Sequence, residues 1–296
     1  MLGDCCTPVV ICVYNRPELT RILYSILEIV RPRSLFIVAD APISSDMGDV
    51  LACKEVRDVF SVITWQCDVN RNYSDEHQGC AARVISGLNW VFDQVEEAII
   101  LEDDCIPDAS FFPFCAEMLT KYREDERIFM ISGTCFVSDL FVGKNSYYFS
   151  RLTHAWGWAT WRSAWKRFDA KMSLWPYTRS SFALSEMLDD VSIANYFTGV
   201  FDEVFHDATR LDVWDYQWFF SGLIARAFSV VPRVNLVTNI GFGPKATHTR
   251  NVDFAQSLAR KSLTFPLMHP EAIIADAYLD GWDFKRAYLW EALPDV

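Results

Sequence analysis

The sequence predicts an α/β protein built on a mostly parallel central sheet flanked by helices. Apolar runs of strand length alternate with amphipathic helical patterns through the first half of the chain, which is the order of successive βαβ units. The runs are continuously apolar rather than alternating, as in strands that are covered on both faces. Several of them end in a polar or acidic residue, which is typical of strands whose carboxyl ends border a ligand site.

The elements of the first half follow from these patterns in chain order. The continuous apolar run at 8–14 predicts a buried strand, and Pro17 suits the first turn of the helix after it. The alternation then repeats as far as residue 131. The expected strands are 8–14, 35–39, 62–65, 98–101 and 128–131, and the expected helices are 17–30, 48–59, 79–92 and 110–122.

The second half of the chain is richer in tryptophan, less regular and more helical. Trp158, Trp161 and Trp165 have the spacing of a helix that packs one face against a core. The other expected elements are helices and loops over 173–210, a helix at 214–227, a strand at 229–231 and a glycine-containing loop at 239–245. Because no repeat or linker is visible, we expect a single domain, 1–296, with two halves, 1–133 and 134–296.

The composition is that of a folded globular protein and disfavours several functional classes. The chain has 296 residues, of which 51% are hydrophobic, and its net charge is −12. This acidic balance argues against nucleic acid as a partner. No apolar run approaches the roughly 18 residues of a membrane span, and residues 1–8 do not resemble a signal peptide. The 9 cysteines, an odd number, predict free thiols in a reducing compartment, so we expect a cytoplasmic location.

Three consecutive carboxylates form the most informative motif of the chain. Glu102, Asp103 and Asp104 directly follow the apolar run 98–101. Like charges this close repel one another and need a positive partner unless water surrounds them. A cluster of oxygen donors at the carboxyl end of a strand predicts a site for Mn²⁺ or Mg²⁺. The alternative is a solvated acidic turn before the helix that starts near Ser110.

Polar residues also end the first two expected strands. Asn15 and Arg16 follow the first, and Asp40 ends the second, so all three are candidates to contact a nucleotide. Arg16 is alternatively a solvated turn residue, and Asp40 a helix cap near Ser44. The chain lacks both the Gly-x-Gly-x-x-Gly and the Gly-Lys-Ser/Thr loop that hold phosphates. A nucleotide diphosphate would therefore need a metal at the acidic cluster.

An ordered set of motifs resembles the GT-A fold glycosyltransferases, which have a Rossmann-like sheet. The sequence resembles N-acetylglucosaminyltransferases with a Glu-Asp-Asp metal motif and bacterial HlpA-like sugar transferases. The residues that carry the resemblance are Asn15-Arg16-Pro17, Leu101 to Asp104 with Phe111-Phe112 after it, Ala155 to Trp161, Trp214 to Trp218, and Gly241-Phe242-Gly243 through Thr247-His248.

The resemblance implies a division of roles on the donor side. Asp104 would bind the metal, and Glu102 and Asp103 would contact the ribose and the donor sugar. Arg16 and Asp40 would hold the nucleotide. The half 1–133 would accordingly bind the nucleotide sugar, and the half 134–296 would bind the acceptor and supply the catalytic base.

Asp215 is the expected general base. The resemblance implies this role because the residue lies in a Trp-Asp-x-x-Trp setting, between Trp214 and Trp218. Apolar walls on both sides would also raise the pKa of a carboxylate and improve it as a base near neutral pH. Asp212, three residues earlier, is the reserve candidate if the helix begins there. The alternative is that Asp215 only caps the helix.

Residues of the second half complete the expected site. The resemblance suggests His248 as a second metal ligand or phosphate contact, and Lys245 as an electrostatic aid. Trp156, just before the tryptophan stripe, is a candidate floor beneath the donor sugar, and His154 a candidate for the acceptor side. His248 is alternatively an ordinary surface residue.

The predicted protein is thus a hexosyl- or N-acetylhexosaminyltransferase that depends on a metal and inverts the anomeric centre. It would move a sugar from a nucleotide diphosphate, with UDP favoured, to a glycan or lipid-linked acceptor, as in surface-polysaccharide synthesis. Peripheral contact with the inner membrane stays open, because no clearly basic amphipathic helix is present. The alternatives are a sugar nucleotidyltransferase on a related fold and a non-catalytic binding protein on a decayed transferase scaffold.

Overall fold

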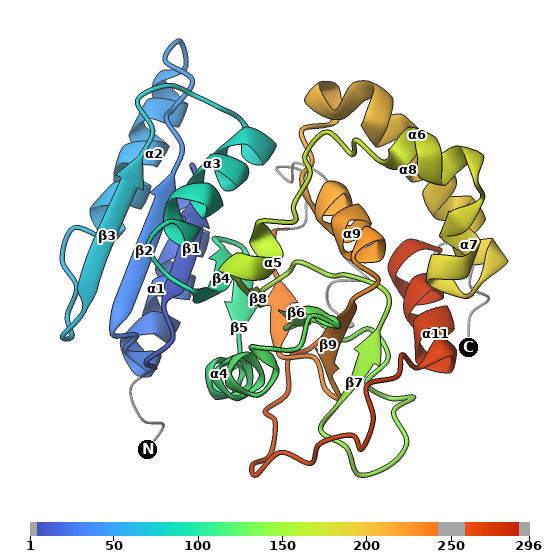
Figure 1. Ribbon diagram of the computed structural model, residues 1–296. Helices are drawn as coiled ribbons and strands as arrows, with labels where there is room; N and C mark the ends of the chain where they lie inside the picture. The colour runs from blue at the N-terminus through green and yellow to red at the C-terminus, as the bar shows by residue number, and fades with distance from the viewer. Residues whose placement is uncertain (1–4, 242–257, 290–296) are drawn as a thin grey trace.

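The computed structural model describes residues 5–241 and 258–289, and it confirms a Rossmann-like α/β architecture (Figure 1). The main sheet of this part of the chain has eight strands in the order β3-β2-β1-β4-β8-β6-β9-β7. The neighbouring strands β3, β2, β1 and β4 are parallel, as are β6 and β9. The strands β8 and β7 run antiparallel to their neighbours, so the sheet is mixed on its second side.

The elements expected in the first half lie within a residue or two of the observed ranges, except for the third strand, whereas β5, β7, β8, β10 and α11 were not expected from the sequence. The main-sheet strands are β1 (Val9–Val13), β2 (Ser34–Ala39), β3 (Asp68–Tyr73), β4 (Glu97–Glu102), β6 (Ile128–Ser132), β7 (Tyr147–Ser150), β8 (Trp158–Trp161) and β9 (Phe228–Pro232). A small second sheet pairs β5 (Cys105–Pro107) with β10 (Val237–Asn239). The helices are α1 (Pro17–Val30), α2 (Met47–Val59), α3 (Cys80–Phe92), α4 (Phe111–Tyr122), α5 (Arg162–Trp165), α6 (Trp175–Ser180), α7 (Ala183–Leu188), α8 (Val191–Leu211), α9 (Asp215–Ile224) and α11 (Ala277–Tyr288).

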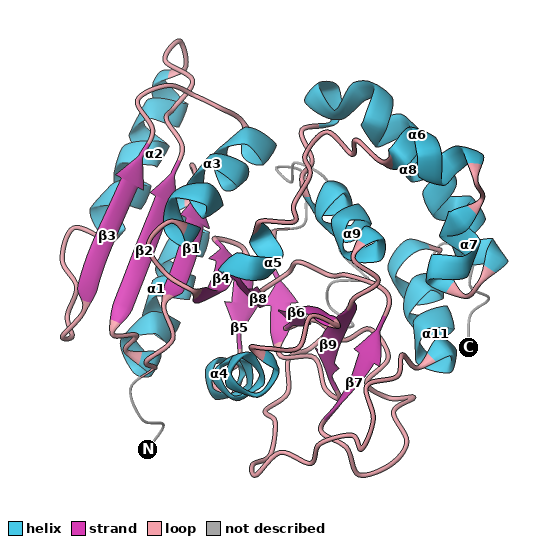
Figure 2. Cartoon of the chain, viewed as in Figure 1, coloured by secondary structure: helices cyan, strands magenta, loops and turns pink. Residues whose placement is uncertain are grey.

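The direction of the crossovers explains how the first helices cover the sheet. The chain steps outward from β1 to β2 to β3 through α1 and α2, which pack against each other. It then returns through α3 to β4, on the other side of β1. Because crossovers are right-handed, α3 lies on the face opposite to α1 and α2 (Figure 2). This reversal puts the carboxyl ends of β1 and β4 side by side.

The third strand is not where the sequence placed it. Residues 62–65 form a bend, and the strand beside β2 is β3 at Asp68–Tyr73. β3 pairs with β2 alone, so it is an edge strand, and its residues are half-buried or exposed. Its polar sequence therefore lacks the apolar run that marks a central strand.

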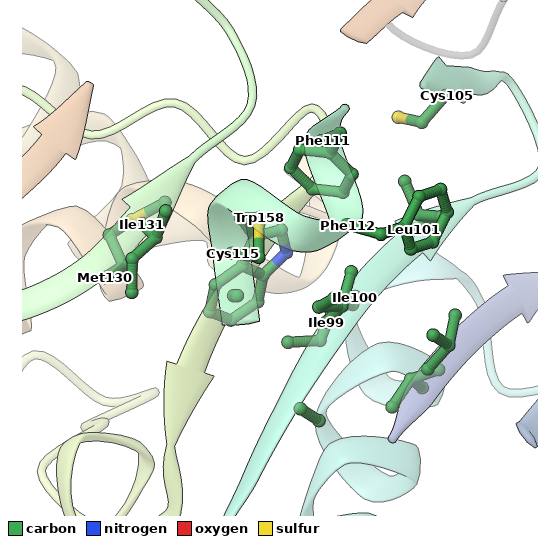
Figure 3. Packing of buried hydrophobic residues seen from close by; sticks show 14 of the residues in the cluster. Ile99, Ile100, Leu101, Cys105, Phe111, Phe112, Cys115, Met130, Ile131 and Trp158 are labelled. Atoms are coloured by element: carbon green, nitrogen blue, oxygen red, sulfur yellow. The ribbon is translucent and has the colours of Figure 1, made fainter. Parts of the chain in front are cut away.

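The predicted tryptophan helix is also wrong. Trp158 and Trp161 belong to β8, which pairs with β4 and β6, and only the short α5 reaches Trp165. The three indoles nevertheless lie in the core, where Trp158 packs near the β4 residues and the first turn of α4 (Figure 3). The core position that the spacing suggested is thus correct, whereas the secondary structure is not.

The helices of the second half form a separate apolar cluster beside the sheet. Its centre consists of buried aromatic side chains from α6, α8 and α9, among them Trp175, Phe197, Phe201 and Phe220. α11 contributes Phe284 and also contacts β7. In Figure 1 these helices gather on the side of the molecule away from β3. No helix in residues 5–241 and 258–289 is long and apolar enough to cross a membrane.

Candidate functional site

A cavity of about 550 Å³ lies where the carboxyl ends of β1 and β4 meet helices α8, α9 and α11 of the second half. Arg16, Glu102 and Asp104 line it on the side of the sheet. Asp215 lines it from the start of α9, and His154 and Trp156 from the segment between β7 and β8. The structure therefore brings five of the residues predicted from the sequence, and the acceptor-side candidate His154, to one cavity.

Arg16 connects β1 to the acidic cluster. Its Nη1 donates to Asp104 Oδ2 at 2.7 Å and to Asp103 Oδ1 at 3.4 Å. All three side chains are largely buried, so water screens the ion pairs only in part. The guanidinium is therefore the cation that this part of the chain itself supplies to the cluster.

The small sheet holds Asp104 in place from the other side. Asn239 pairs with Cys105 in the β5–β10 ladder, and the Ile240 N–H donates to the Asp104 carbonyl oxygen at 2.8 Å. The Asn239 side-chain amide donates to Asp104 Oδ1 at 3.4 Å. A Cβ added at Gly241 would lie 2.1 Å from Asp104 Oδ2, so the chain approaches this carboxylate as closely as only glycine allows.

The acidic cluster retains protons near neutral pH. Burial, followed by repulsion from Asp104 and Asp103, raises the pKa of Glu102 to about 8. Burial and the Asp104 charge likewise raise the pKa of Asp103 to about 7, even though Arg16 opposes the shift. One arginine is thus too little positive charge for three adjacent carboxylates.

The donor set fits a hard divalent cation that also binds a diphosphate. Mg²⁺ and Mn²⁺ prefer oxygen ligands, and Mg²⁺ is commonly held by one or two protein carboxylates together with substrate phosphates and water. Glu102 and Asp104 supply two carboxylates on one cavity wall. Within residues 5–241 and 258–289, no group of three or more His, Cys, Asp or Glu side chains is placed to hold a metal. The fit is therefore to a site completed by substrate, and the metal stays a prediction.

Asp215 begins α9 and is exposed toward the cavity. A carboxylate in the first turn of a helix is stabilised as an anion by the helix dipole. Of the two expected apolar walls, Trp214 lines the cavity with Asp215, whereas Trp218 does not line it, because it is fully buried and stacks on Phe129 in the core. Trp214 is also buried and stacks on Trp158.

Asp212 stabilises the start of α3. It does not share a helical face with Asp215, because it precedes α9 and has a left-handed φ of 51°. Its carboxylate accepts the N–H groups of Cys80 and Ala81, both at 2.9 Å. It therefore caps the first turn of α3 and ties the helical half to the sheet half.

Asn15 and Asp40 lie near the strand ends but do not line the cavity. The Asn15 side chain donates to Asp49 at 2.6 Å. The buried Asp40 carboxylate accepts backbone N–H groups from Ala41 at 2.8 Å and from Gly79 at 3.0 Å. Both residues thus order the loops beside the strand ends, and their contact with a nucleotide stays a prediction. Lys245 and His248 lie outside the described residues.

An aromatic wall faces the acidic cluster across the same cavity. Its members are Phe136, Trp156, Tyr196, Tyr216 and Tyr288. Only Trp156 was expected from the sequence, because the others lie on α8, α9, α11 and a loop whose patterns show no more than core packing. Gly157 has a left-handed φ of 67°, and a Cβ there would lie 2.7 Å from Val237 Cγ2. The turn after Trp156 therefore requires glycine at this position.

Comparison with known proteins gives distant likenesses alone. No protein-family profile and no curated protein matches the sequence. A structure of UDP-glucose pyrophosphorylase complexed with UDP-glucose has a TM-score of 0.27 and 12% identity, over 49% of this chain and 62% of its own. The apo structure of UDP-glucose pyrophosphorylase has a TM-score of 0.26 and 11% identity, over 50% and 65%. This chain spans less than two thirds of either structure, and a likeness this distant assigns neither activity nor substrate.

Proposed function

We propose that this protein is a metal-dependent, inverting glycosyltransferase that uses a nucleotide-diphosphate sugar, with UDP as the favoured nucleotide. The observation that carries the proposal is the single cavity at which Glu102, Asp104 and Asp215 meet. Two of these carboxylates lie at the strand ends where α/β folds bind ligands. The third comes from a distant helix and faces the same space, as a base for a second substrate must.

The donor half of the cavity suits a diphosphate leaving group. Glu102 and Asp104 would hold Mn²⁺ or Mg²⁺, which neutralises negative charge on the diphosphate when bound. Arg16 supplies a further positive charge at the same wall and keeps Asp104 oriented through its 2.7 Å hydrogen bond. The β5–β10 ladder fixes the backbone beneath it, so the carboxylate is positioned before substrate arrives.

Asp215 would serve as the general base for the acceptor. As the acceptor oxygen attacks the anomeric carbon, its proton moves to the Asp215 carboxylate. The bond from the anomeric carbon to the diphosphate oxygen breaks, and its electron pair leaves with the nucleotide diphosphate. Attack from the face opposite to the leaving group inverts the anomeric configuration. The exposure of Asp215 to the cavity is what allows this contact.

A sugar nucleotidyltransferase is the second candidate function. It would use the same strand ends to bind a sugar phosphate and a nucleoside triphosphate. Against it, Arg16 is the one arginine or lysine among the described residues that line the cavity. A triphosphate carries more negative charge than a diphosphate and would need more cationic groups. The non-catalytic alternative leaves the carboxylate of α9 at the cavity unexplained.

The test is cleavage of donor in the presence of Mn²⁺. The protein is incubated with a panel of UDP-sugars and simple glycosides, and release of UDP is followed together with the anomeric signals of the product by NMR. The proposal expects UDP release from at least one donor and a product of inverted configuration. UDP-sugar formation from UTP and a sugar 1-phosphate, without UDP release, would instead favour the nucleotidyltransferase.

A further inference from the structure

We infer that His154, oriented by Asp283, hydrogen-bonds a hydroxyl of the acceptor sugar at the aromatic wall of the cavity. This inference rests on the proposed glycosyl transfer and specifies its acceptor subsite. His154 is assigned as the residue that contacts the acceptor, and Asp283 as a positioning residue that acts through it.

The two residues form a buried pair from distant parts of the chain. His154 Nε2 lies 2.6 Å from Asp283 Oδ1, which is the geometry of a short, charge-assisted hydrogen bond. The Asp283 side chain is 0% exposed and that of His154 8%. The pair links the segment before β8 to α11, so the imidazole is fixed by two elements of the fold.

Asp283 has no other role visible in its surroundings. Its Oδ2 is buried and has no hydrogen-bond partner among the described residues. A buried carboxylate with one bare oxygen is costly, and the hydrogen bond from His154, together with the nearby charge of Arg286, compensates it. Nearby Asp280 is different, because it accepts from the Ser150 hydroxyl and the Arg151 N–H. The Asp283 carboxylate thus serves the imidazole rather than the backbone.

This arrangement leaves Nδ1 as the ring nitrogen available to a ligand. A carboxylate is an acceptor, so Nε2 must carry the proton that is shared with Asp283. Nδ1 then holds the lone pair of the neutral ring. In residues 5–241 and 258–289, no hydrogen bond to Nδ1 is present, while the side chain forms part of the cavity wall. A hydroxyl group of a sugar can donate to such a nitrogen.

The neighbours of the imidazole suit a sugar ring. The Tyr288 ring lies stacked with it at a centroid distance of 6.1 Å, and Phe136 meets it edge-on at 4.6 Å. Trp156 lines the same wall, and its ring centroid lies 5.8 Å from that of Phe136. Aromatic faces pack on the apolar face of a sugar, and a fixed hydrogen-bond acceptor among them selects its orientation.

The first experiment measures the imidazole directly. Protein labelled with ¹⁵N-histidine is studied by long-range ¹H–¹⁵N NMR above about pH 8, where an ordinary histidine is neutral. His154→Gln assigns the signal among the 5 histidines. We expect the proton on Nε2, and a change of the Nδ1 signal on titration with methyl glycosides of glucose, galactose and N-acetylglucosamine. A proton on Nδ1 with a bare Nε2, or glycosides that perturb Trp156 without moving His154, would overturn the inference.

The second experiment separates acceptor from donor. Hydrolysis of a UDP-sugar by water needs no acceptor subsite, whereas transfer to a glycoside does. His154→Gln and Asp283→Asn should raise the acceptor KM roughly tenfold to a hundredfold, the cost of a lost buried hydrogen bond, and should lower transfer to a glycoside more than hydrolysis. His269→Gln is the matched control, because that histidine pairs with Glu117 away from the cavity. Equal losses of hydrolysis and transfer would contradict the assignment, whereas absence of both in the wild type would count against the proposed function instead.

Discussion

Arg16 Nη1 and Asp104 Oδ2 lie 2.7 Å apart, and this ion pair joins the ends of two strands that 88 positions of sequence separate. It places one positive charge in a cluster where burial and mutual repulsion raise the pKa values of Glu102 and Asp103. Arg16 is therefore the internal cation of the cluster, and its single positive charge does not neutralise the three carboxylates. We expect this excess of negative charge to lower the stability of the metal-free protein and to make the protein more stable when Mn²⁺ is added.

Arg16→Gln should destabilise the metal-free protein and enlarge its response to metal. Removal of the guanidinium leaves the carboxylates unneutralised, at a cost of about 1–3 kcal/mol for a pair that is largely but not fully buried. Added Mn²⁺ should then raise the melting temperature of the variant more than that of the wild type. Thermal unfolding followed by circular dichroism measures both effects. If Mn²⁺ raised the melting temperature of the variant less than that of the wild type, Arg16 and the metal would not be neutralising the same carboxylates.

The stability of the metal-free protein should fall as the pH rises from about 5 to about 8. In this window the folded state keeps protons on Glu102, with a pKa of about 8, and Asp103, with a pKa of about 7. The unfolded chain has already released them, so the free energy of unfolding declines with pH, by up to about 1.4 kcal/mol per unit for each proton. Mn²⁺ should therefore stabilise more at about pH 8 than at about pH 5. Glu102→Gln should flatten the decline, and an unchanged slope in that variant would contradict this origin.

Gly241→Ala should impair ligand binding without unfolding the protein. The added methyl group would lie 2.1 Å from Asp104 Oδ2, so the carboxylate must move away from its position beside Arg16. We expect metal-dependent nucleotide affinity to fall by roughly tenfold or more, with a melting temperature close to that of the wild type. Gly199→Ala is the control, because a Cβ there meets nothing within 4 Å. Equal affinities in the two variants would show that the Asp104 position is not critical.

Asp215→Asn should lower the catalytic rate, whereas Asp212→Ala should lower the stability of the protein. Loss of the base should lower the transfer rate by roughly 10²–10⁴-fold with little change in stability or in nucleotide binding. Loss of the α3 cap should cost about 1 kcal/mol of stability, since the Cys80 and Ala81 N–H groups lose their acceptor. Initial rates and thermal unfolding of both variants distinguish them. A severe rate loss confined to Asp212→Ala would make that residue the base instead.

The sequence was most informative where a single short segment carries both the structure and the chemistry. The run 98–101 predicted β4, and Glu102 and Asp104 after it line the cavity because a strand end fixes their position directly, whereas the buried Asp103 does not line it. The edge strand β3 gave no such signal, because a half-exposed strand needs no apolar run. The spacing of Trp158 and Trp161 was compatible with a helix, but pairing with β4 and β6 made it a strand.

The aromatic wall could not be predicted for a different physical reason. Tyr196, Tyr216 and Tyr288 lie on three helices, and each looks like an ordinary core residue in its own helix. Their meeting depends on how α8, α9 and α11 pack, which no local pattern encodes. The same holds for the bond between Asp212 and the start of α3 and for the pairing of His154 with Asp283, which joins positions 129 residues apart.

The most direct test of the donor site is calorimetric titration of UDP into the protein with and without Mn²⁺. Wild type is compared with Asp104→Ala and with Asp58→Ala, an exposed carboxylate paired with Lys54 as the control. The proposed site predicts binding that requires Mn²⁺, is lost in Asp104→Ala and is retained in Asp58→Ala. Binding of UDP that is indifferent to both the metal and Asp104, or no binding of any nucleotide with any divalent metal, would contradict it.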